Sequence, residues 1–292
     1  MRSMPDWERI NRRLTEFGLS VPGGSGARPV GGGDINAAWR LDTSSGPVFV
    51  KTGATDALSM FEAEAEGLAE LASAAALRVP DVLGSGVAGN TAFLILEWLE
   101  ITAPSADTET LLGEQLAETH RHQQERFGWR RDNTIGRTPQ INTPADDWLE
   151  FFATRRLRYQ LDLAARGGYA GELSRKGAQL IERLPELFLG YTPVASLLHG
   201  DLWGGNWASV GGEPVVFDPA VYYGDRESDL AMTRLFGGFS ASFYEAYEAT
   251  WPLADGHERR NSLYQLYHVL NHLNLFGRGY LGRALALIDQ LL

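Results

Sequence analysis

Two apolar segments that each end near an acidic residue constrain the fold more than any other feature of the chain. A loop after the apolar run 195–198 carries Asp201 and, five residues later, Asn206; the apolar run 214–217 ends at Asp218. Phosphoryl transfer needs such a set, because one carboxylate orients the attacking hydroxyl and accepts its proton, while an amide oxygen and a second carboxylate hold Mg²⁺ against nucleotide phosphates. The pattern predicts Asp201 as the base and Asn206 and Asp218 as metal ligands. Two polar loops with capping side chains are the alternative.

A lysine at the end of an apolar strand is the second signal. Lys51 ends this strand, and the segment 56–76 has helical periodicity. On a helical wheel Glu64 falls in the apolar sector, whereas Glu62 and Glu66 fall outside it. A carboxylate on a buried face is costly without a partner. We therefore expect Glu64 to hold Lys51 in a kinase-type nucleotide site, although a single lysine at a strand end is more often a solvated edge residue.

A glycine-rich turn precedes the Lys51 strand. It consists of Gly31, Gly32, Gly33, Asp34, Ile35 and Asn36. Backbone N–H groups of such a turn can approach phosphates closely. The turn lacks the Gly-Lys-Ser/Thr of a Walker loop, and no βαβ unit surrounds it. Only its position upstream of Lys51 favours a phosphate-covering loop over an ordinary surface turn.

The order of the expected elements indicates an α+β fold with two lobes. Residues 1–97 are expected to form a small antiparallel sheet with one long helix, and residues 98–292 a larger, mostly helical lobe. The expected strands of the small lobe are a hairpin around residues 43–46 and the runs 81–83 and 91–97. The expected helices of the large lobe are 108–125, 145–166, 171–186, 240–250 and 259–276. At the junction, Glu97, Trp98 and Leu99 either offer backbone groups to an adenine edge or form a plain connector.

Composition narrows the classes of partner. The net charge is −11, which argues against a nucleic-acid partner. No apolar stretch reaches the ~18 residues of a membrane helix, and the first twenty residues lack a signal-peptide core, so we expect a cytoplasmic protein without a membrane partner. The chain has no cysteine, and only two of its 26 basic residues are lysines, Lys51 and Lys176.

Together these segments resemble the fructosamine kinase (ketosamine-3-kinase) family, within the protein-kinase-like fold. The sharpest marker is HGDLWGGN at 199–206. The other matching segments are GPVFVK at 46–51, MFEAEAEGL at 60–68, PQIN at 139–142, DDWLEFF at 146–152, DPAVYYGDRESDLAM at 218–232, LFGGF at 235–239 and LYHVLNHLNLFG at 266–277. The resemblance covers almost the whole chain. It implies phosphorylation of a sugar hydroxyl on a ketoamine by ATP, after which the unstable adduct sheds the sugar.

The resemblance also implies cofactors, partners and site residues. ATP and Mg²⁺ are the implied cofactors, and the partners are ketosamine small molecules or glycated protein amines. The glycine-rich turn and the 97–99 junction are assigned to the nucleotide. Trp203 is assigned to the sugar, together with Gln140, Asn142 and Asp147. Asp34 stands where several family members carry a cysteine, so a thiol switch cannot operate here.

Several alternatives stay open within this resemblance. The chain could be another small-molecule kinase of the same fold, acting on an aminoglycoside or a choline-type alcohol, or a catalytically inactive nucleotide-binding scaffold. We expect a monomer. Asp229 is expected to anchor a helix beneath the catalytic loop, as in relatives of the fold. The stretch 155–158 is expected to be a solvated arginine face, with an acceptor-site role for Arg156 as the alternative.

Overall fold

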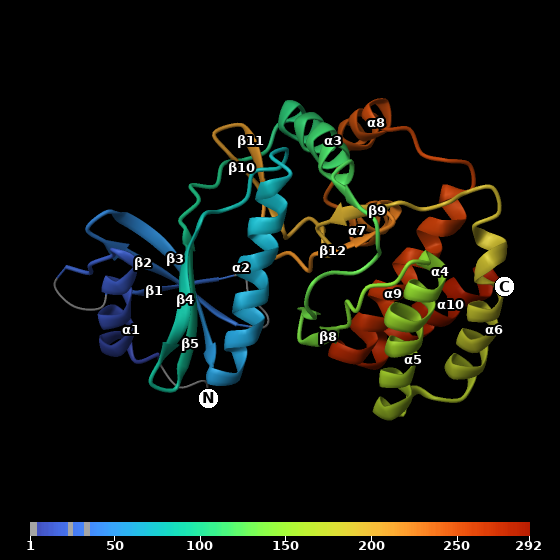
Figure 1. Ribbon diagram of the computed structural model, residues 1–292, viewed down its shortest axis with the longest axis horizontal. Coiled ribbons are helices and arrows are strands. Elements are labelled where there is room, and N and C mark those ends of the chain that lie inside the picture. Colours follow the sequence, from blue (N-terminus) through green and yellow to red (C-terminus); the bar gives the residue numbers. More distant parts are fainter. Residues whose placement is uncertain (1–4, 23–25, 32–35) are drawn as a thin grey trace.

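A five-stranded antiparallel sheet forms the small lobe of the computed structural model, which describes residues 5–22, 26–31 and 36–292 (Figure 1). Its strands are β1 (Arg28–Val30), β2 (Ala37–Thr43), β3 (Gly46–Ala54), β4 (Val82–Ala88) and β5 (Thr91–Glu97), in the spatial order β1-β2-β3-β5-β4. The β2–β3 hairpin turns at residues 44–45, as the sequence predicts. The sheet, its hairpin and the long helix beside it confirm the predicted character of this lobe.

Two helices cover opposite faces of this sheet (Figure 1). They are α1 (Trp7–Leu14), followed by a 3₁₀ turn over Thr15–Phe17, and α2 (Leu58–Ser73), preceded by a 3₁₀ turn over Thr55–Ala57. Successive strand residues point to opposite faces. Val50 and Ile95 therefore pack with α1, whereas Leu94 and Leu96 pack with α2.

The large lobe is mostly helical, as predicted. Its helices are α3 (Ala106–His120), α4 (Trp148–Phe151), α5 (Tyr159–Ala164), α6 (Glu172–Leu187), α7 (Glu227–Leu235), α8 (Ala241–Thr250), α9 (His257–Phe276) and α10 (Leu281–Leu291), with π-helical turns over Phe152–Arg158 and Ala165–Tyr169 and a 3₁₀ turn over Arg278–Tyr280. Its short strands are β6 (Gln123–Gln124), β7 (Asn133–Ile135), β8 (Thr138–Gln140), β9 (Ala195–Leu198), β10 (Trp207–Val210), β11 (Glu213–Val216) and β12 (Tyr222–Gly224).

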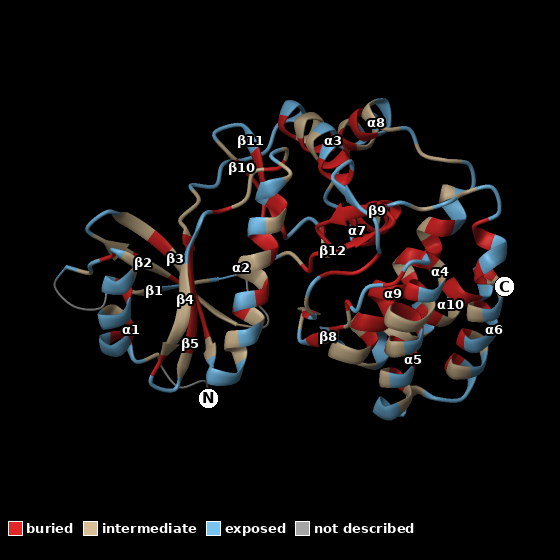
Figure 2. Ribbon diagram, in the orientation of Figure 1, coloured by how far each residue is buried: buried red, intermediate tan, exposed pale blue. Residues whose placement is uncertain are grey.

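One large core runs through this lobe, with buried residues facing inward from most of its helices (Figure 2). Aromatic rings fill its centre: Trp148 contacts Phe151, Phe152 and Tyr264 with ring centroids 5.4–6.1 Å apart. Burial of such rings is the main source of stability in a chain of this size. The core holds β9 and β12 in place, and these strands flank the loops that carry Asp201 and Asp218.

The two lobes share more than one connection. The β10–β11 hairpin pairs with Arg78, which follows α2, and with Thr102, which follows β5. Leu71, near the end of α2, packs into the core of the large lobe rather than that of the small one. The boundary between residues 97 and 98 stays a prediction, because α2 contributes to the cores of both lobes.

Several predicted boundaries are wrong. The helix expected to reach residue 125 ends at His120, because the chain beyond it pairs with β9. The strand expected to stop at residue 83 continues to Ala88. Its glycines read as turn residues, yet a Cβ on Gly84 would lie 2.5 Å from the ring of Phe17, so glycine is required there for close packing.

Two helices are absent from the segments predicted by periodicity, although the resemblance leads us to expect a helix at Asp229, where α7 lies. In α7 nearly every residue is buried, including Glu227 and Asp229, so the helix has no polar face and shows no amphipathic pattern. In α10, by contrast, Ala284, Leu287, Ile288 and Leu291 form a buried stripe at helical spacing. In the part of the chain that the structure describes, no helix is long and apolar enough to cross a membrane.

Candidate active site

The alternation of residues along β3 places Lys51 on the face that α2 covers. Lys51 pairs with Leu94, which packs under α2, whereas its neighbour Val50 packs with α1. Its Nζ donates to Glu64 Oε1 at 2.6 Å and to Asp218 Oδ1 at 2.5 Å. The structure thus brings Lys51 and Glu64 together as the helical wheel predicts. It also adds Asp218, from 167 residues further along the chain, to the pair.

These two carboxylates, Glu64 and Asp218, keep Lys51 protonated. Burial alone lowers the pKa of a lysine. Here the attraction of Asp218 and Glu64 and their hydrogen bonds outweigh burial and raise the pKa of Lys51 above its ordinary value. Lys51 is therefore a permanent cation at neutral pH.

The loop between β9 and β10 carries Asp201 and Asn206 side by side. Gly200 opens this loop with a φ of +82°, and a Cβ there would lie 2.1 Å from Ala220 O, so glycine is required. Asn206 Nδ2 donates to Asp201 O at 2.8 Å and lies 3.4 Å from Asp201 Oδ2. This contact closes the loop and keeps the amide next to the carboxylate.

Asp218 lies two residues after the end of β11 and is linked to the same loop. Its φ of +57° is uncommon for a residue with a side chain. Phe217 N donates to Asn206 O at 3.0 Å, and His199 Nε2 lies 3.0 Å from Phe217 O. The two acidic loops, distant in sequence, therefore meet through Asn206 and His199.

The surroundings of Asp201 suit a proton acceptor. Burial, followed by the negative charges of Asp218 and Asp229, raises the pKa of Asp201 to about 7, and the hydrogen bond from Asn206 opposes this rise. A base works best when its pKa lies near the operating pH. Perturbed pKa values of this kind are typical of functional sites.

Asp229 supports the start of the loop that carries Asp201. Its two carboxylate oxygens accept hydrogen bonds from His199 N at 2.7 Å and from Gly200 N at 2.8 Å. His120 Nε2 lies 3.1 Å from the same carboxylate, and Tyr247 holds the other ring nitrogen. Burial raises the pKa of Asp229, but the hydrogen bond to His120 and the other partners lower it below its ordinary value. The expected anchoring role of Asp229 fits these contacts.

The structure describes only some of the residues predicted to contact the nucleotide. Gly32, Gly33, Asp34 and Ile35 lie outside the described residues, while Gly31 is exposed and Asn36 half-buried. At the junction, Glu97 is held by Arg78 at 2.9 Å, and Trp98 donates to Glu100 at 2.8 Å. Leu99 is half-buried. The side chains of Glu97 and Trp98 thus bond to other residues of the protein. The backbone groups of residues 97–99 stay the predicted contacts for the adenine edge.

The predicted sugar-side residues fall into two groups. Trp203 is 41% exposed within the catalytic loop. Gln140 and Asn142 are buried instead: Gln140 donates to Ala220 O and accepts from Tyr267 OH, and Asn142 contacts Asn133. The Gln140 amide therefore braces the segment after Asp218, and the amides of both residues bond to the protein itself rather than being free for a substrate.

Asp147 and Arg156 likewise have structural contacts. Asp147 caps α4 by accepting from Glu150 N at 2.7 Å. The expectation of a solvated arginine face is wrong for Arg156, which is fully buried, donates to Asn142 Oδ1 at 2.8 Å and lies 4.1 Å from the ring of Tyr222. The aromatic core around it was not visible in the local sequence.

A cluster of charged residues between α2 and the large lobe was not predicted from the sequence. Glu66 and Glu70 on α2 contact Arg130 and Arg131. A signal was present, because two acids four residues apart share a helix face and two consecutive arginines follow Trp129.

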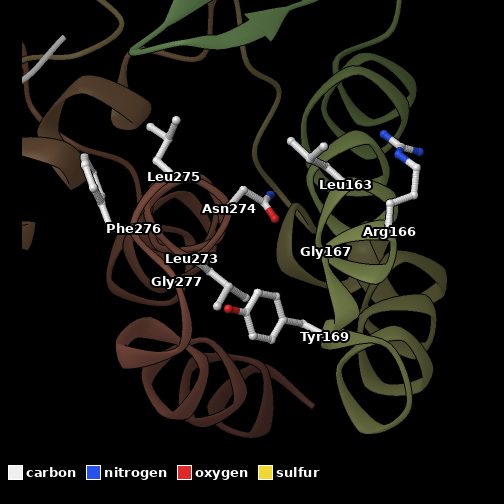
Figure 3. A pocket seen from close by; sticks show the side chains of 9 residues that line it. All are labelled: Leu163, Arg166, Gly167, Tyr169, Leu273, Asn274, Leu275, Phe276 and Gly277. Atoms are coloured by element: carbon white, nitrogen blue, oxygen red, sulfur yellow. The ribbon is translucent and has the colours of Figure 1, made fainter. Parts of the chain in front are cut away.

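A surface hollow of ≈ 540 Å³ lies in another part of the large lobe (Figure 3). It lies between residues 163–169 and the end of α9, and Tyr169 reaches across it toward Gly277. Asn274 points into this region, but its amide already donates to Gln160. None of the predicted site residues lines this hollow.

Comparison with known proteins gives a consistent picture. The family model described as fructosamine kinase matches residues 6–292. The chain is 44% identical to a protein named "Probable ketoamine kinase" from Synechocystis sp., over 91% of this chain and 90% of that protein. It is 43% identical to a chloroplastic protein-ribulosamine 3-kinase of Arabidopsis thaliana, over 90% of this chain and 81% of that protein.

Solved structures show the same relationship. A structure from Haemophilus somnus, named for fructosamine-3-kinase, superimposes with a TM-score of 0.88 at 31% identity and covers 98% of this chain and 97% of its own. An aminoglycoside phosphotransferase superimposes with a TM-score of 0.64 at 16% identity, with 97% of both chains covered. At that identity the second match shows the fold alone.

Proposed function

Since this chain belongs to the fructosamine kinase family, we propose that it transfers the terminal phosphate of ATP to a sugar hydroxyl of a ketosamine. The observation that carries the proposal is the meeting of Lys51, Asp201, Asn206 and Asp218 at one place. These are the residue types that phosphoryl transfer requires. An inactive scaffold has no need to keep all four together.

Asp201 is the proposed base. Its carboxylate accepts the proton of the attacking hydroxyl while that oxygen forms a bond to the terminal phosphorus and the bond to the leaving diphosphate breaks. The raised pKa of Asp201, about 7, supports this role, because a carboxylate of ordinary pKa is a weaker proton acceptor. Asn206 and Asp229 support it by fixing the loop on both sides.

The residues present suit a magnesium ion. Carboxylate and amide oxygens are the ligands that Mg²⁺ prefers. The amide nitrogen of Asn206 is engaged by Asp201 O, which leaves its oxygen for a cation, and the Asp218 carboxylate is 47% exposed. Asn206 and Asp218 would hold the ion, which supplies positive charge against the phosphates.

Lys51 is the proposed phosphate contact on the small-lobe side. Asp218 holds its ammonium group in this structure, and Glu64 keeps the side chain extended toward the same place. The glycine-rich turn and the backbone of residues 97–99 are proposed to complete the nucleotide site. Ala37, which follows the turn, pairs with Thr52 next to Lys51, and Glu97, which opens the junction, pairs with Val48 of the same strand.

Trp203 is the proposed contact for the sugar. An exposed tryptophan beside a catalytic carboxylate offers an apolar ring face to the C–H groups of a sugar. The names of the relatives, ketoamine kinase and ribulosamine 3-kinase, favour a ketosamine as the acceptor and its third carbon as the phosphorylated position. We expect a monomer that acts in the cytoplasm on small ketosamines or on glycated protein amines, and size-exclusion chromatography tests the first part.

A panel of acceptors tests the proposed function. Labelled ATP is supplied with magnesium and with fructose- and ribulose-derived ketoamines, and kanamycin and choline serve as controls. We expect label on a ketoamine, followed by release of the free amine on standing. Transfer to kanamycin or choline without transfer to any ketoamine would contradict the proposal and favour another kinase of the same fold.

A further inference from the structure

Helix α2 is fastened to the large lobe at several points. Leu71 packs in the large core, and a Cβ on Gly67 would lie 3.2 Å from Val221 and 3.5 Å from Pro219, so the helix backbone directly approaches the segment after Asp218. Glu70 accepts from Tyr223 OH at 2.8 Å and from Trp129 Nε1 at 3.3 Å. These contacts all lie in the second half of the helix.

Two ion pairs made by Glu66 extend this attachment along α2 toward Glu64. Glu66 Oε1 lies 2.6 Å from Arg131 Nη1, and Glu66 Oε2 lies 2.8 Å from Arg130 Nη2. Arg131 also donates to Ser59 O and Oγ, both at 3.2 Å, and so reaches the first turn of α2. The arginines therefore contact α2 on both sides of the residue that holds Lys51.

The segment that carries these arginines is itself fixed to the strand after Asp218. Gly128 and Tyr223 exchange two backbone hydrogen bonds of 2.8 and 2.9 Å. Asn133 Nδ2 donates to Val221 O at 2.8 Å. Residues 128–133 are thus held at both ends by residues 221–223, which follow Asp218 within a few positions.

We propose that Glu66 and Arg131 are a positioning pair: they set α2 against the large lobe, so that Lys51 and Asp218 keep a fixed separation. Glu66 and Arg131 are 37% and 25% exposed, and pairs of this exposure contribute little to overall stability. The pair instead fixes the position of Glu64, which lies on the same helix two residues before Glu66. The proposal depends on the proposed nucleotide site but not on the identity of the acceptor.

A double-mutant cycle tests this pair. Glu66→Gln and Arg131→Gln are each expected to raise the KM for ATP and the Kd for ADP by about three- to tenfold, and the double variant no further, because the two residues act through one contact. The KM for the ketoamine and the melting temperature stay near wild type. Glu62→Gln, at an exposed position of the same helix, is the matched control.

Two outcomes overturn the positioning role. One is an unchanged Kd for ADP in both single variants. The other is a fall in melting temperature with equal changes in the KM of both substrates, which would indicate a merely structural contact. Nucleotide binding is measured without any acceptor, so a failure of the proposed acceptor chemistry is seen separately in the acceptor panel.

The two lysines support a second, independent inference. Each is held between two carboxylates: Lys51 between Glu64 and Asp218, and Lys176 between Glu172 at 2.8 Å and Asp289 at 2.6 Å. The hydrogen bonds from Asp289 and Glu172 raise the pKa of Lys176. The remaining 24 basic residues are arginines, whose guanidinium groups stay protonated.

Glycation requires an unprotonated amine. The nitrogen lone pair attacks the aldehyde carbon, a C–N bond forms and water leaves; a proton shift from C2 to C1 then gives the ketoamine without any oxidant. We infer that this protein resists the modification that its substrates carry: the Lys51 side chain, 11% exposed and enclosed by Glu64 and Asp218, stays out of reach of a sugar aldehyde, and Lys176 is the one further lysine on which an adduct can form. At Lys176, each pKa unit that Glu172 and Asp289 add lowers the free-amine fraction about tenfold.

Incubation with ribose in the absence of ATP tests this inference, because the protein cannot then act on its own adducts. Peptide mapping by mass spectrometry is expected to find no adduct at Lys51 and slow modification at Lys176, while kinase activity, assayed afterwards, persists. Arg175→Lys places an exposed lysine beside Lys176 on α6, and this new lysine is expected to react faster than Lys176. The double variant Glu172→Gln, Asp289→Asn is expected to accelerate the reaction at Lys176.

An adduct at Lys51, or equal rates at positions 175 and 176, would overturn the inference. The terminal α-amine is scored separately, because its pKa differs from that of a lysine. The readout is mass alone, so it does not depend on the proposed activity.

Discussion

Lys51 Nζ and Asp218 Oδ1 lie 2.5 Å apart, although the two residues are separated by 167 positions in the chain. The contact joins the small-lobe sheet to the loop proposed to bind magnesium. Lys51→Met removes the cation from this place. We expect weaker ADP binding and a fall in kcat/KM by about two orders of magnitude, because a fixed charge next to the phosphates is lost. Titration calorimetry and steady-state kinetics measure both effects.

Glu64→Ala provides the matched comparison for that variant. It is expected to act like a milder form of Lys51→Met, because Asp218 still holds the lysine. Glu62→Ala, at an exposed position, is expected to be neutral. Wild-type kinetics for Lys51→Met would exclude Lys51 from the nucleotide site.

Asp201→Asn separates catalysis from binding. The amide keeps the shape of the side chain but cannot accept the hydroxyl proton, so we expect kcat to fall by about 10²- to 10⁴-fold. The Kd for ADP is expected to stay near wild type, since Asp201 is not a proposed nucleotide contact. Turnover at the wild-type rate would reject Asp201 as the base.

Gly67→Ala tests the close approach of α2 to the segment after Asp218. Alanine favours a helix by about 1 kcal/mol over glycine, yet its Cβ would lie 3.2 Å from Val221 Cγ2. The helix has to shift by a few tenths of an ångström, so we expect a higher KM for ATP with little loss in melting temperature. Ala69→Gly, at an exposed position of α2, is the reverse control and is expected to lower stability without changing the KM. A KM unchanged by Gly67→Ala would show that the helix tolerates the shift.

The buried side chain of His268 is expected to make the protein less stable as the pH falls. Burial, and then the charge of His272, lower the pKa of His268 to about 3. The unfolded chain binds a proton there below about pH 6.5 and the folded chain does not, so this residue makes the free energy of unfolding fall by about 1.4 kcal/mol per pH unit as the pH drops below 6.5.

His268→Leu removes that term. We expect its stability relative to wild type to rise as the pH is lowered from 7.5 to 5.5, as measured by urea unfolding. Asp201 and Asp225, whose pKa values burial raises to about 7 and about 6, act in the opposite direction but equally in both proteins. A constant difference between the two proteins across this range would show that His268 binds protons equally in the folded and unfolded states.

The site was predictable where a local pattern determines which way a side chain points. The helical wheel places Glu64 inward, and strand alternation places Lys51 opposite it; the structure joins the two at 2.6 Å. The loops of Asp201 and Asp218 come together because the chain between Asn206 and Asp218 forms a single hairpin, β10–β11, which returns to where it began.

The rest depends on contacts between distant segments. Gln140 and Asn142 look like exposed polar residues in sequence, but Ala220, Tyr267 and Arg156 bury them. Glu66 lies outside the apolar sector of its helix, yet Arg130 and Arg131 from the other lobe reach it. Neither local periodicity nor propensity contains information on such partners.

The burial of Leu71 in the large core has a practical consequence for inhibitor design. A compound that requires α2 to swing outward and open a space behind Lys51 would also have to pull this side chain out of the main core. Such a compound would bind weakly, because part of its interaction energy would be spent on disrupting the protein. Chemists seeking selective inhibitors should therefore build outward from the proposed nucleotide site toward the exposed ring of Trp203.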